Sequence, residues 1–205
     1  MYLSQLILNE RLPQVYRDLS NAHAFHQRIM NGFPDQPTET PRSDWHILYR
    51  QEPDSYKVLV QSAIEPDWSC LPDRYLECNV KVKRFDLNPA RWREGQLFQF
   101  RLRANPSKRD KQTHKIVGFY RREDQLAWLA RKGKNYGFSL MSVDAIPSAN
   151  VFAKKKNDQA PIRIHTVLFE GVLQVVEPTA LVKAVQQGIG RGRSYGCGLL
   201  SLARM

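Results

Sequence analysis

Phe98-Gln-Phe-Arg-Leu-Arg103 alternates apolar with polar side chains, and this stretch decides the fold class of the chain. A period of two is typical of a strand that turns one face to the core and the other to solvent. The polar face of this strand carries Arg101 and Arg103. A sheet with one apolar and one basic face is suited to binding RNA.

Two further segments have strand character. Residues 76–83 alternate in the same way, with Lys81 and Lys83 on the polar side. The run from Ile162 to Phe169 is apolar on both faces, which favours a central position in a sheet. The sequence therefore predicts sheets in both halves of the chain.

Helical patterns lie between these strands. Asn21 is a candidate cap for a helix with an apolar stripe, ended by Gly32 and Pro34. Residues 123–131 and 178–187 predict two more helices, the last opened by a proline and stopped by Gly188. Each half then approximates a β-α-β-β-α-β order, joined by a turn-rich linker at 86–95.

The composition indicates a polyanionic partner. The 205 residues include 31 Lys and Arg against 20 Asp and Glu, a formal charge of +11. Nucleic acid is the first candidate and an anionic membrane surface the second. No apolar run approaches the roughly 20 residues that cross a bilayer, and the N-terminus lacks the basic start of a signal peptide.

The three cysteines have no C-x-x-C spacing, which argues against a disulfide framework and a zinc site. We therefore expect a cytoplasmic protein that needs no metal or other cofactor and does not associate with a membrane.

A glycine-rich segment near the C-terminus is the strongest local motif. Five of the eleven residues from Gly188 to Gly198 are glycine, and Arg191 and Arg193 lie among them. Such a loop lets backbone N–H groups and guanidinium groups approach a phosphate. Its spacing and its helix-loop-strand order exclude a P-loop and a Rossmann nucleotide site. A plain turn with solvated arginines is the equally favoured alternative.

Two other groups of residues have a functional and a structural interpretation. Lys154, Lys155 and Lys156 form a basic segment between two strands, which either neutralises phosphates or is a solvated loop. His23 and His26 are three apart and share one helix face, as a general base and acid would. From the residues alone, a polar pair on an amphipathic helix is the more common meaning of such a pattern.

Four short stretches, in this order and spacing, make the chain resemble a known family along almost its full length. They are Met1-Tyr-Leu-Ser4, Arg101-Leu-Arg-Ala-Asn-Pro106, Leu168-Phe-Glu-Gly-Val172, and Gly188-Ile-Gly190 with Gly196-Cys-Gly-Leu-Leu-Ser201. The chain is similar to the CasE family of the RAMP superfamily, the CRISPR repeat endoribonucleases of type I-E Cascade complexes.

The resemblance implies a fold and an activity. The fold is α+β, with two tandem ferredoxin-like (RRM-like) β-α-β-β-α-β domains and antiparallel sheets, here expected at 1–88 and 96–205. The activity is metal-independent cleavage of precursor CRISPR RNA at repeat hairpins, by attack of a 2′-OH that leaves a 2′,3′-cyclic phosphate and a 5′-OH. The expected partners are the repeat stem-loop, the mature guide RNA, which stays bound, and other Cascade subunits.

The resemblance also implies site residues. The catalytic histidine of the family falls on His26, and a position that is commonly Tyr falls on His23. A loop Lys of the family falls on Arg193, which keeps the charge. The basic hairpin matches residues 154–156 loosely. The further RNA-binding residues that we expect are Arg28, Arg101, Arg103 and Arg191.

Two other functions remain as alternatives. The first is a non-catalytic RRM-type module that protects a guide RNA, although the RNP1 motif is absent and Lys115-Ile-Val-Gly-Phe119 is only a faint echo of it. The second is a basic DNA-binding protein. Incubation with repeat RNA in EDTA would distinguish the endoribonuclease from the first alternative, and a deoxy substrate would test the second.

Overall fold

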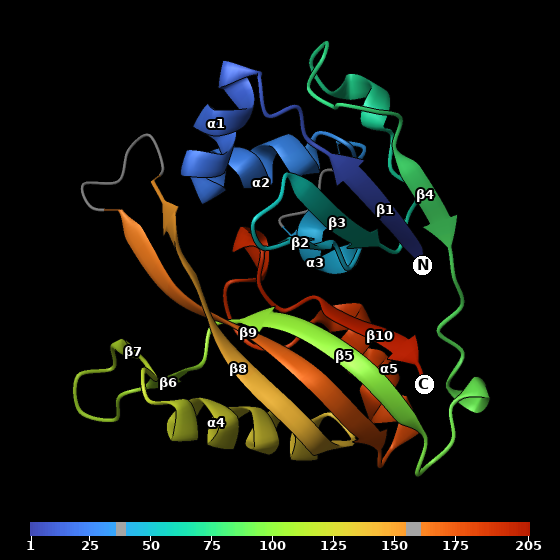
Figure 1. Cartoon of the computed structure of the whole chain (residues 1–205), viewed down its shortest axis with the longest axis vertical. Helices are drawn as coiled ribbons and strands as arrows, with labels where there is room; N and C mark the ends of the chain where they lie inside the picture. The colour runs from blue at the N-terminus through green and yellow to red at the C-terminus, as the bar shows by residue number, and fades with distance from the viewer. Residues whose placement is uncertain (36–39, 155–160) are drawn as a thin grey trace. The chain divides into compact units, whose positions relative to one another are not determined.

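The computed structural model describes residues 1–35, 40–154 and 161–205. The chain divides into two compact units, each built around one four-stranded sheet (Figure 1). The first unit comprises residues 1–86, 150–164 and 193–196, and the second comprises 87–149, 165–192 and 197–205. The domain limits 1–88 and 96–205 remain a prediction. None of the helices in the described ranges is both long and apolar enough to cross a bilayer.

The sheet of the first unit has the strand order β2-β3-β1-β4. Its strands are β1 (Tyr2–Ile7), β2 (Leu48–Gln51), β3 (Lys57–Ser62) and β4 (Lys81–Arg84). β1 lies in the middle and pairs antiparallel with β3 and β4, so that Ser4 lies opposite both Val60 and Val82.

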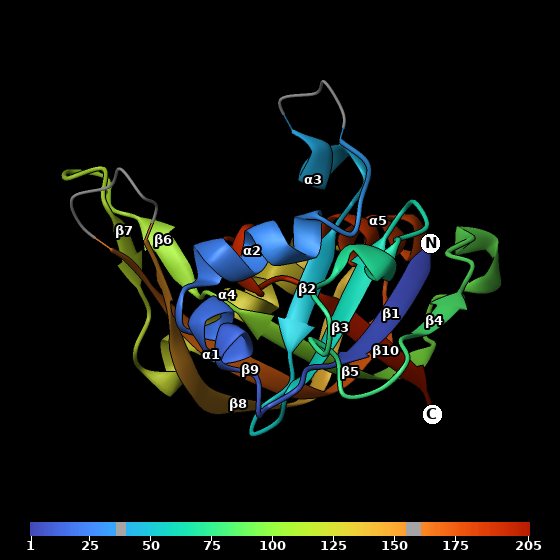
Figure 2. The same cartoon turned by 90° about the horizontal axis from the view of Figure 1, so that it is seen from above.

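Four helical segments accompany this sheet. They are α1 (Pro13–Ser20), α2 (Ala22–Met30), the short α3 (Pro41–Asp44) and the 3-10 turn η1 (Trp68–Cys70). The predicted cap is confirmed, because the Asn21 side chain accepts a hydrogen bond from the His23 backbone N–H (3.1 Å). Phe25 and Ile29 of α2 are buried in the core. Figure 2 shows α1 and α2 side by side.

The strand predicted at 76–83 is correct only in its last part. Regular pairing is limited to β4, and every residue of β4 is exposed, with Val82 at 43%. Upstream, Leu76 makes a single bridge to Leu8. The reason is the position of β4 at the edge of the sheet, where lysines also keep the unpaired edge charged. Alternation in this segment therefore does not indicate burial.

The sheet of the second unit has the order β10-β5-β9-β8. Its strands are β5 (Leu97–Ala104), β8 (Phe138–Ala153), β9 (Ile162–Val175) and β10 (Leu200–Arg204). β5 buries Phe98, Phe100 and Leu102 and exposes the residues between them, as predicted. β9 lies between β5 and β8, which confirms the central position predicted for the run that begins at Ile162.

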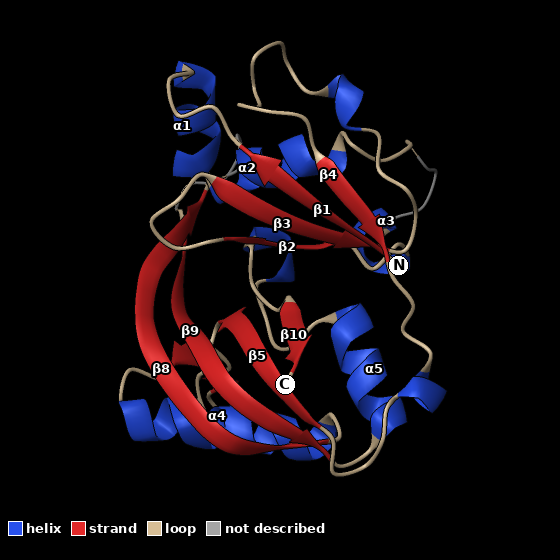
Figure 3. Ribbon diagram, turned by 45° about the vertical axis from the view of Figure 1, so that its right-hand side comes forward, coloured by secondary structure: helices blue, strands red, loops and turns tan. Residues whose placement is uncertain are grey.

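The remaining elements are α4 (Arg122–Asn135), α5 (Pro178–Gln187), the β6–β7 hairpin (Ser107–Arg109 and Ile116–Gly118), and the 3-10 turns η2 (Pro89–Arg91) and η3 (Arg193–Tyr195). α5 has the predicted limits and ends at Gly188 with a φ of 78°. Figure 3 distinguishes these helices from the strands by colour. The Trp128 ring of α4 stacks on Phe169 of β9 (centroids 6.2 Å apart).

The two sheets share one topology. Numbered within its own unit, each sheet has the order 4-1-3-2, in which the first strand lies between the third and the fourth. This is the order of the ferredoxin-like fold. The predicted fold class, α+β with two tandem ferredoxin-like folds and antiparallel sheets, is therefore confirmed.

Gly171→Ala tests the packing of β9 against β8. A Cβ atom at Gly171 would lie 2.1 Å from the Ser142 carbonyl oxygen, which cannot move without disturbing the strand. We expect a loss of about 3 kcal/mol or more in the free energy of unfolding. Gly95→Ala is the control, because Gly95 also has a positive φ (81°) but no atom closer than 4.0 Å to its would-be Cβ. Equal losses in urea unfolding of the two variants would contradict this.

Candidate functional site

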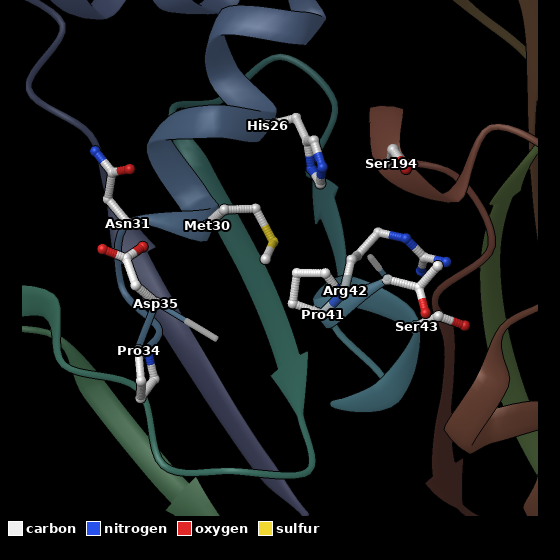
Figure 4. A pocket seen from close by; sticks show the side chains of 10 residues that line it. His26, Met30, Asn31, Pro34, Asp35, Pro41, Arg42, Ser43 and Ser194 are labelled. Carbon is white, nitrogen blue, oxygen red and sulfur yellow. The ribbon is translucent and has the colours of Figure 1, made fainter. Parts of the chain in front are cut away.

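A cleft of about 470 Å³ in the first unit contains His26 (Figure 4). Its walls come from segments far apart in the sequence: the C-terminal half of α2, the short helix α3, and η3. The lining residues include His26 and Met30 from α2, Arg42 and Ser43 from α3, and Ser194 from η3. Figure 4 shows the His26 ring directed toward the side on which Arg42 and Ser194 lie.

The His26 imidazole is held by aromatic rings rather than by hydrogen bonds. It stacks on Tyr49 (centroids 6.4 Å apart, planes 17° apart) and meets the edge of Tyr195 at the same centroid distance. Its Nδ1 atom is buried without a hydrogen-bond partner in the described part of the chain. Burial, followed by the positive charges of Arg42 and His23, lowers the pKa of His26 to about 4. The ring is therefore neutral at physiological pH and able to accept a proton.

Arg42 is the site residue that sequence reasoning missed. One of its guanidinium nitrogens, Nη1, donates to the Ile47 carbonyl (3.2 Å), and burial followed by repulsion from Arg193 lowers its pKa. The Asp35 carboxylate lines the same cleft, but it does not counter the effect of Arg193 on the pKa of Arg42. Two cations brought together beside a cleft favour an anionic ligand. Neither a motif nor a periodic pattern surrounds Arg42 in the sequence, so no signal marked it.

Tyr49 holds the part of the glycine-rich loop that lies in the first unit. Its hydroxyl donates to the Ser194 carbonyl (2.9 Å). Gly196 has a φ of 78°, and a Cβ atom there would lie 3.2 Å from the Tyr49 ring. The loop therefore needs glycine at this position to pack against the tyrosine. Arg42 is close enough to His26 to lower its pKa, and Arg193 is close enough to Arg42 to lower the pKa of Arg42. The fold therefore brings His26 and Arg193, which were predicted as site residues from distant parts of the sequence, close to the same arginine.

Asn21 connects the N-terminus of α2 to the basic segment. Its side-chain amide donates to the Lys154 carbonyl (2.9 Å) and accepts from the Lys154 N–H (3.0 Å). The same oxygen caps His23. Lys154, exposed at its side chain, thus begins the basic segment beside the helix that carries both histidines. Lys155 and Lys156 lie outside the described residues.

Arg28 is engaged within the protein. Its Nε donates to Asp18 (2.8 Å), and its guanidinium lies over the Tyr75 ring at 5.3 Å. The Tyr75 hydroxyl donates to the same carboxylate oxygen (2.8 Å). This network joins α1, α2 and the segment before β4, so a structural role accounts for Arg28. Its predicted contact with RNA remains a prediction.

The other predicted RNA-binding residues belong to the second unit. Arg101 pairs with Glu170 on the neighbouring strand β9. Arg103 donates to the Ala149 carbonyl (2.8 Å) and to Thr166 (3.3 Å). Arg191 is exposed and forms a backbone bridge with Asn105. Arg191 therefore presents charge at the surface, whereas Arg101 is paired with a carboxylate and Arg103 is partly occupied by contacts to β8 and β9.

The described residues contain no group of three or more His, Cys, Asp or Glu side chains that could hold a metal ion.

The chain belongs to the CRISPR associated protein family, whose model matches residues 1–204. It is 35% identical over 99% of its length to the whole of "CRISPR-associated endoribonuclease Cse3" of Thermus thermophilus. It is 33% identical to "CRISPR system Cascade subunit CasE" of Escherichia coli, with 99% of each chain covered. Among solved structures, CRISPR endoribonuclease Cse3 bound to a 19-nucleotide RNA matches with a TM-score of 0.85 and 33% identity, covering 99% of this chain and 100% of that one.

His26 makes the stability of the fold depend on pH. In the unfolded chain a histidine titrates near 6.5 and in the folded protein His26 titrates near 4, so between these values only the unfolded state takes up the proton. Its contribution to stability is complete above pH 6.5 and is lost as the pH falls toward 4. Between pH 7 and 5 we expect wild type to lose about 2 kcal/mol more than His26→Gln in urea unfolding. Parallel losses in the two proteins would contradict the lowered pKa.

Proposed function

We propose that this protein is a metal-independent endoribonuclease that binds the stem-loops of CRISPR repeats and cleaves precursor CRISPR RNA into guide RNAs. The observation that carries the proposal is a neutral imidazole, His26, in a cleft that Arg42 also lines, with a second cation, Arg193, close to Arg42. The names of its relatives, an endoribonuclease and a Cascade subunit, support the same reaction and the same assembly.

The reaction needs no external nucleophile, because RNA carries a 2′-OH beside each phosphate. Neutral His26 removes the proton from that hydroxyl as the oxygen attacks phosphorus. The bond from phosphorus to the 5′-oxygen of the next nucleotide breaks, which leaves a 2′,3′-cyclic phosphate and, once that oxygen has gained a proton, a 5′-OH. Acid–base catalysis of this kind contributes about 10²- to 10⁴-fold, so the positioning of the RNA must supply much of the remainder.

The two arginines act on the phosphate. Negative charge accumulates on the phosphorane oxygens in the transition state, and fixed cations in a partly buried site stabilise it. Arg42 has a second effect, because its charge helps to keep His26 neutral and hence free to accept a proton. In this proposal Arg193 binds the phosphate. His23, which lies near His26 on α2, has a supporting role when the 5′-oxygen departs.

The lysines at 154–156, together with Arg101 and Arg191, extend RNA binding beyond the cleft, and the product stays bound as the guide RNA of a Cascade complex. We also propose that the reaction takes place in the cytoplasm. The support is that Cys70, Cys78 and Cys197 are all free thiols, two of them exposed, which fits a reducing compartment.

His26→Ala tests the proposed base. We expect the rate of single-turnover cleavage of the repeat RNA, measured in EDTA, to fall at least 10²-fold, because proton transfer is lost. Affinity for the hairpin should stay within a few-fold, since one neutral ring adds little to many phosphate contacts. Full-rate cleavage by this variant would remove His26 from the mechanism, and cleavage by wild type that requires a metal would overturn the proposed reaction.

Arg42→Gln separates the two effects of the arginine. For wild type, kcat/KM should rise with pH through an acid limb near pH 4 as His26 loses its proton, and then level off. Removal of a positive neighbour raises the pKa of His26, so the limb should move to higher pH, and the plateau should fall because the phosphorane loses a cation.

Arg17→Gln is the matched control for this variant. Arg17 is exposed on α1 and is not among the groups that lower the pKa of His26, so its loss should leave the acid limb in place. An unmoved limb in Arg42→Gln would show that Arg42 does not act on His26.

A further inference from the structure

Tyr120 in the second unit presents an aromatic ring to solvent. It is 74% exposed, more than any other aromatic side chain in the described ranges. The residue lies between the β6–β7 hairpin and the start of α4 (Figure 1). One side of the ring is supported by the His165 imidazole (centroids 4.6 Å apart, planes 36° apart), and it also lies 3.7 Å from the position of a Cβ on Gly118. The ring is therefore backed on one side and open on the rest.

The backbone under this ring is fixed by a buried polar side chain. The Gln125 amide, on a residue only 7% exposed, donates to the carbonyls of Phe119 (3.0 Å) and Tyr120 (3.4 Å). The same nitrogen lies 3.5 Å from Nε2 of His165, whose carbonyl accepts from Asn105 (2.7 Å). Such a network holds the ring pair in one place, which reduces the entropy cost of stacking another ring on it.

Basic residues are frequent in the segment that leads up to Tyr120 and follows it directly. Among the residues from 107 to 122, the basic side chains are Lys108, Arg109, Lys111, Lys115, Arg121 and Arg122. The one carboxylate in this stretch, Asp110, accepts hydrogen bonds from the turn, including the Thr113 N–H at 2.7 Å. Lys108 and Arg131 also lie over the Phe119 ring, at 5.8 and 5.9 Å. A fixed aromatic surface within a basic patch has the two features that single-stranded RNA requires.

We propose that Tyr120, backed by His165, is a stacking platform for one unpaired nucleotide of the bound RNA, outside the paired stem. The basic residues of the β6–β7 hairpin hold the adjoining phosphates. The inference rests on the proposed function, which identifies the ligand as RNA. It adds a contact that a stem with blunt ends cannot make. The occupant is unpaired because the bases of a duplex already have both faces stacked, whereas a splayed base has a free face.

The test uses a stem-loop with 2′-deoxyribose at the scissile nucleotide, which keeps it intact. It is compared with the same RNA carrying five unpaired nucleotides on its 5′ or its 3′ side, one of them 2-aminopurine. We expect one of the two extensions to tighten binding about 5- to 150-fold in anisotropy titrations. The fluorescence of its 2-aminopurine should fall on binding, because stacking quenches this base. Tyr120→Leu should abolish both effects and leave the affinity for the blunt stem unchanged, whereas Tyr120→Phe should keep both.

Tyr16→Leu is the control, because Tyr16 is an exposed tyrosine (54%) on α1 that lies outside this patch. An extension effect that survives in Tyr120→Leu, or is absent with both extensions in wild type, would overturn the platform. Cleavage of the all-ribose stem is measured in parallel. If the wild-type protein cleaves the stem but shows no extension effect that depends on Tyr120, only the platform is wrong. If it shows the extension effect but does not cleave the stem, only the proposed function is wrong.

Discussion

The Tyr49 side chain is the contact on which the candidate site depends. It is 3% exposed at the centre of the first unit, on β2. Its ring meets Phe25 edge-on (centroids 5.5 Å apart) and stacks on His26, so it fixes α2 from two positions along that helix. Its hydroxyl donates to the Ser194 carbonyl and so fixes η3. One aromatic residue thus joins the elements that carry the proposed base and the proposed phosphate-binding arginine.

Burial and charge together set the chemistry of this site. A histidine in water is partly protonated near neutral pH, and a base that already carries a proton cannot remove another. Here the surrounding rings exclude water from His26 and the nearby cations oppose its protonation. The cations that keep the base neutral are also suited to an anionic phosphate, so one electrostatic arrangement serves both needs. The buried Nδ1 without a partner is the structural cost of this arrangement.

Local patterns in the sequence predicted the elements whose structure depends on near neighbours. The Asn21 cap, the alternation in β5 and the proline and glycine that bound α5 are examples. The prediction for residues 76–83 was wrong in part because edge position depends on the whole sheet. The faint RNP1 echo at 115–119 falls on β7, which pairs with β6 outside both four-stranded sheets and so cannot form an RRM surface.

The site was only partly predictable for the same reason. The histidine was found through a resemblance, because two histidines on a helix are weak evidence on their own. Arg42 could not be found, since its importance comes from α3 folding beside residues 16 positions earlier and about 150 later in the chain. Arg28 was predicted to bind RNA, but Asp18 on the preceding helix pairs with it, and that pairing appears only in the folded protein.

The most direct test of this account is an NMR titration of the His26 imidazole in the free, folded protein. Selective labelling of histidine, with His26→Gln to assign the resonance, gives the pKa of this one ring. The account predicts a value of about 4, with the neutral form throughout the range from pH 5.5 to 8. A pKa at or above about 6.5, the value of a solvated histidine, would contradict the central claim that the fold holds His26 ready to act as a base.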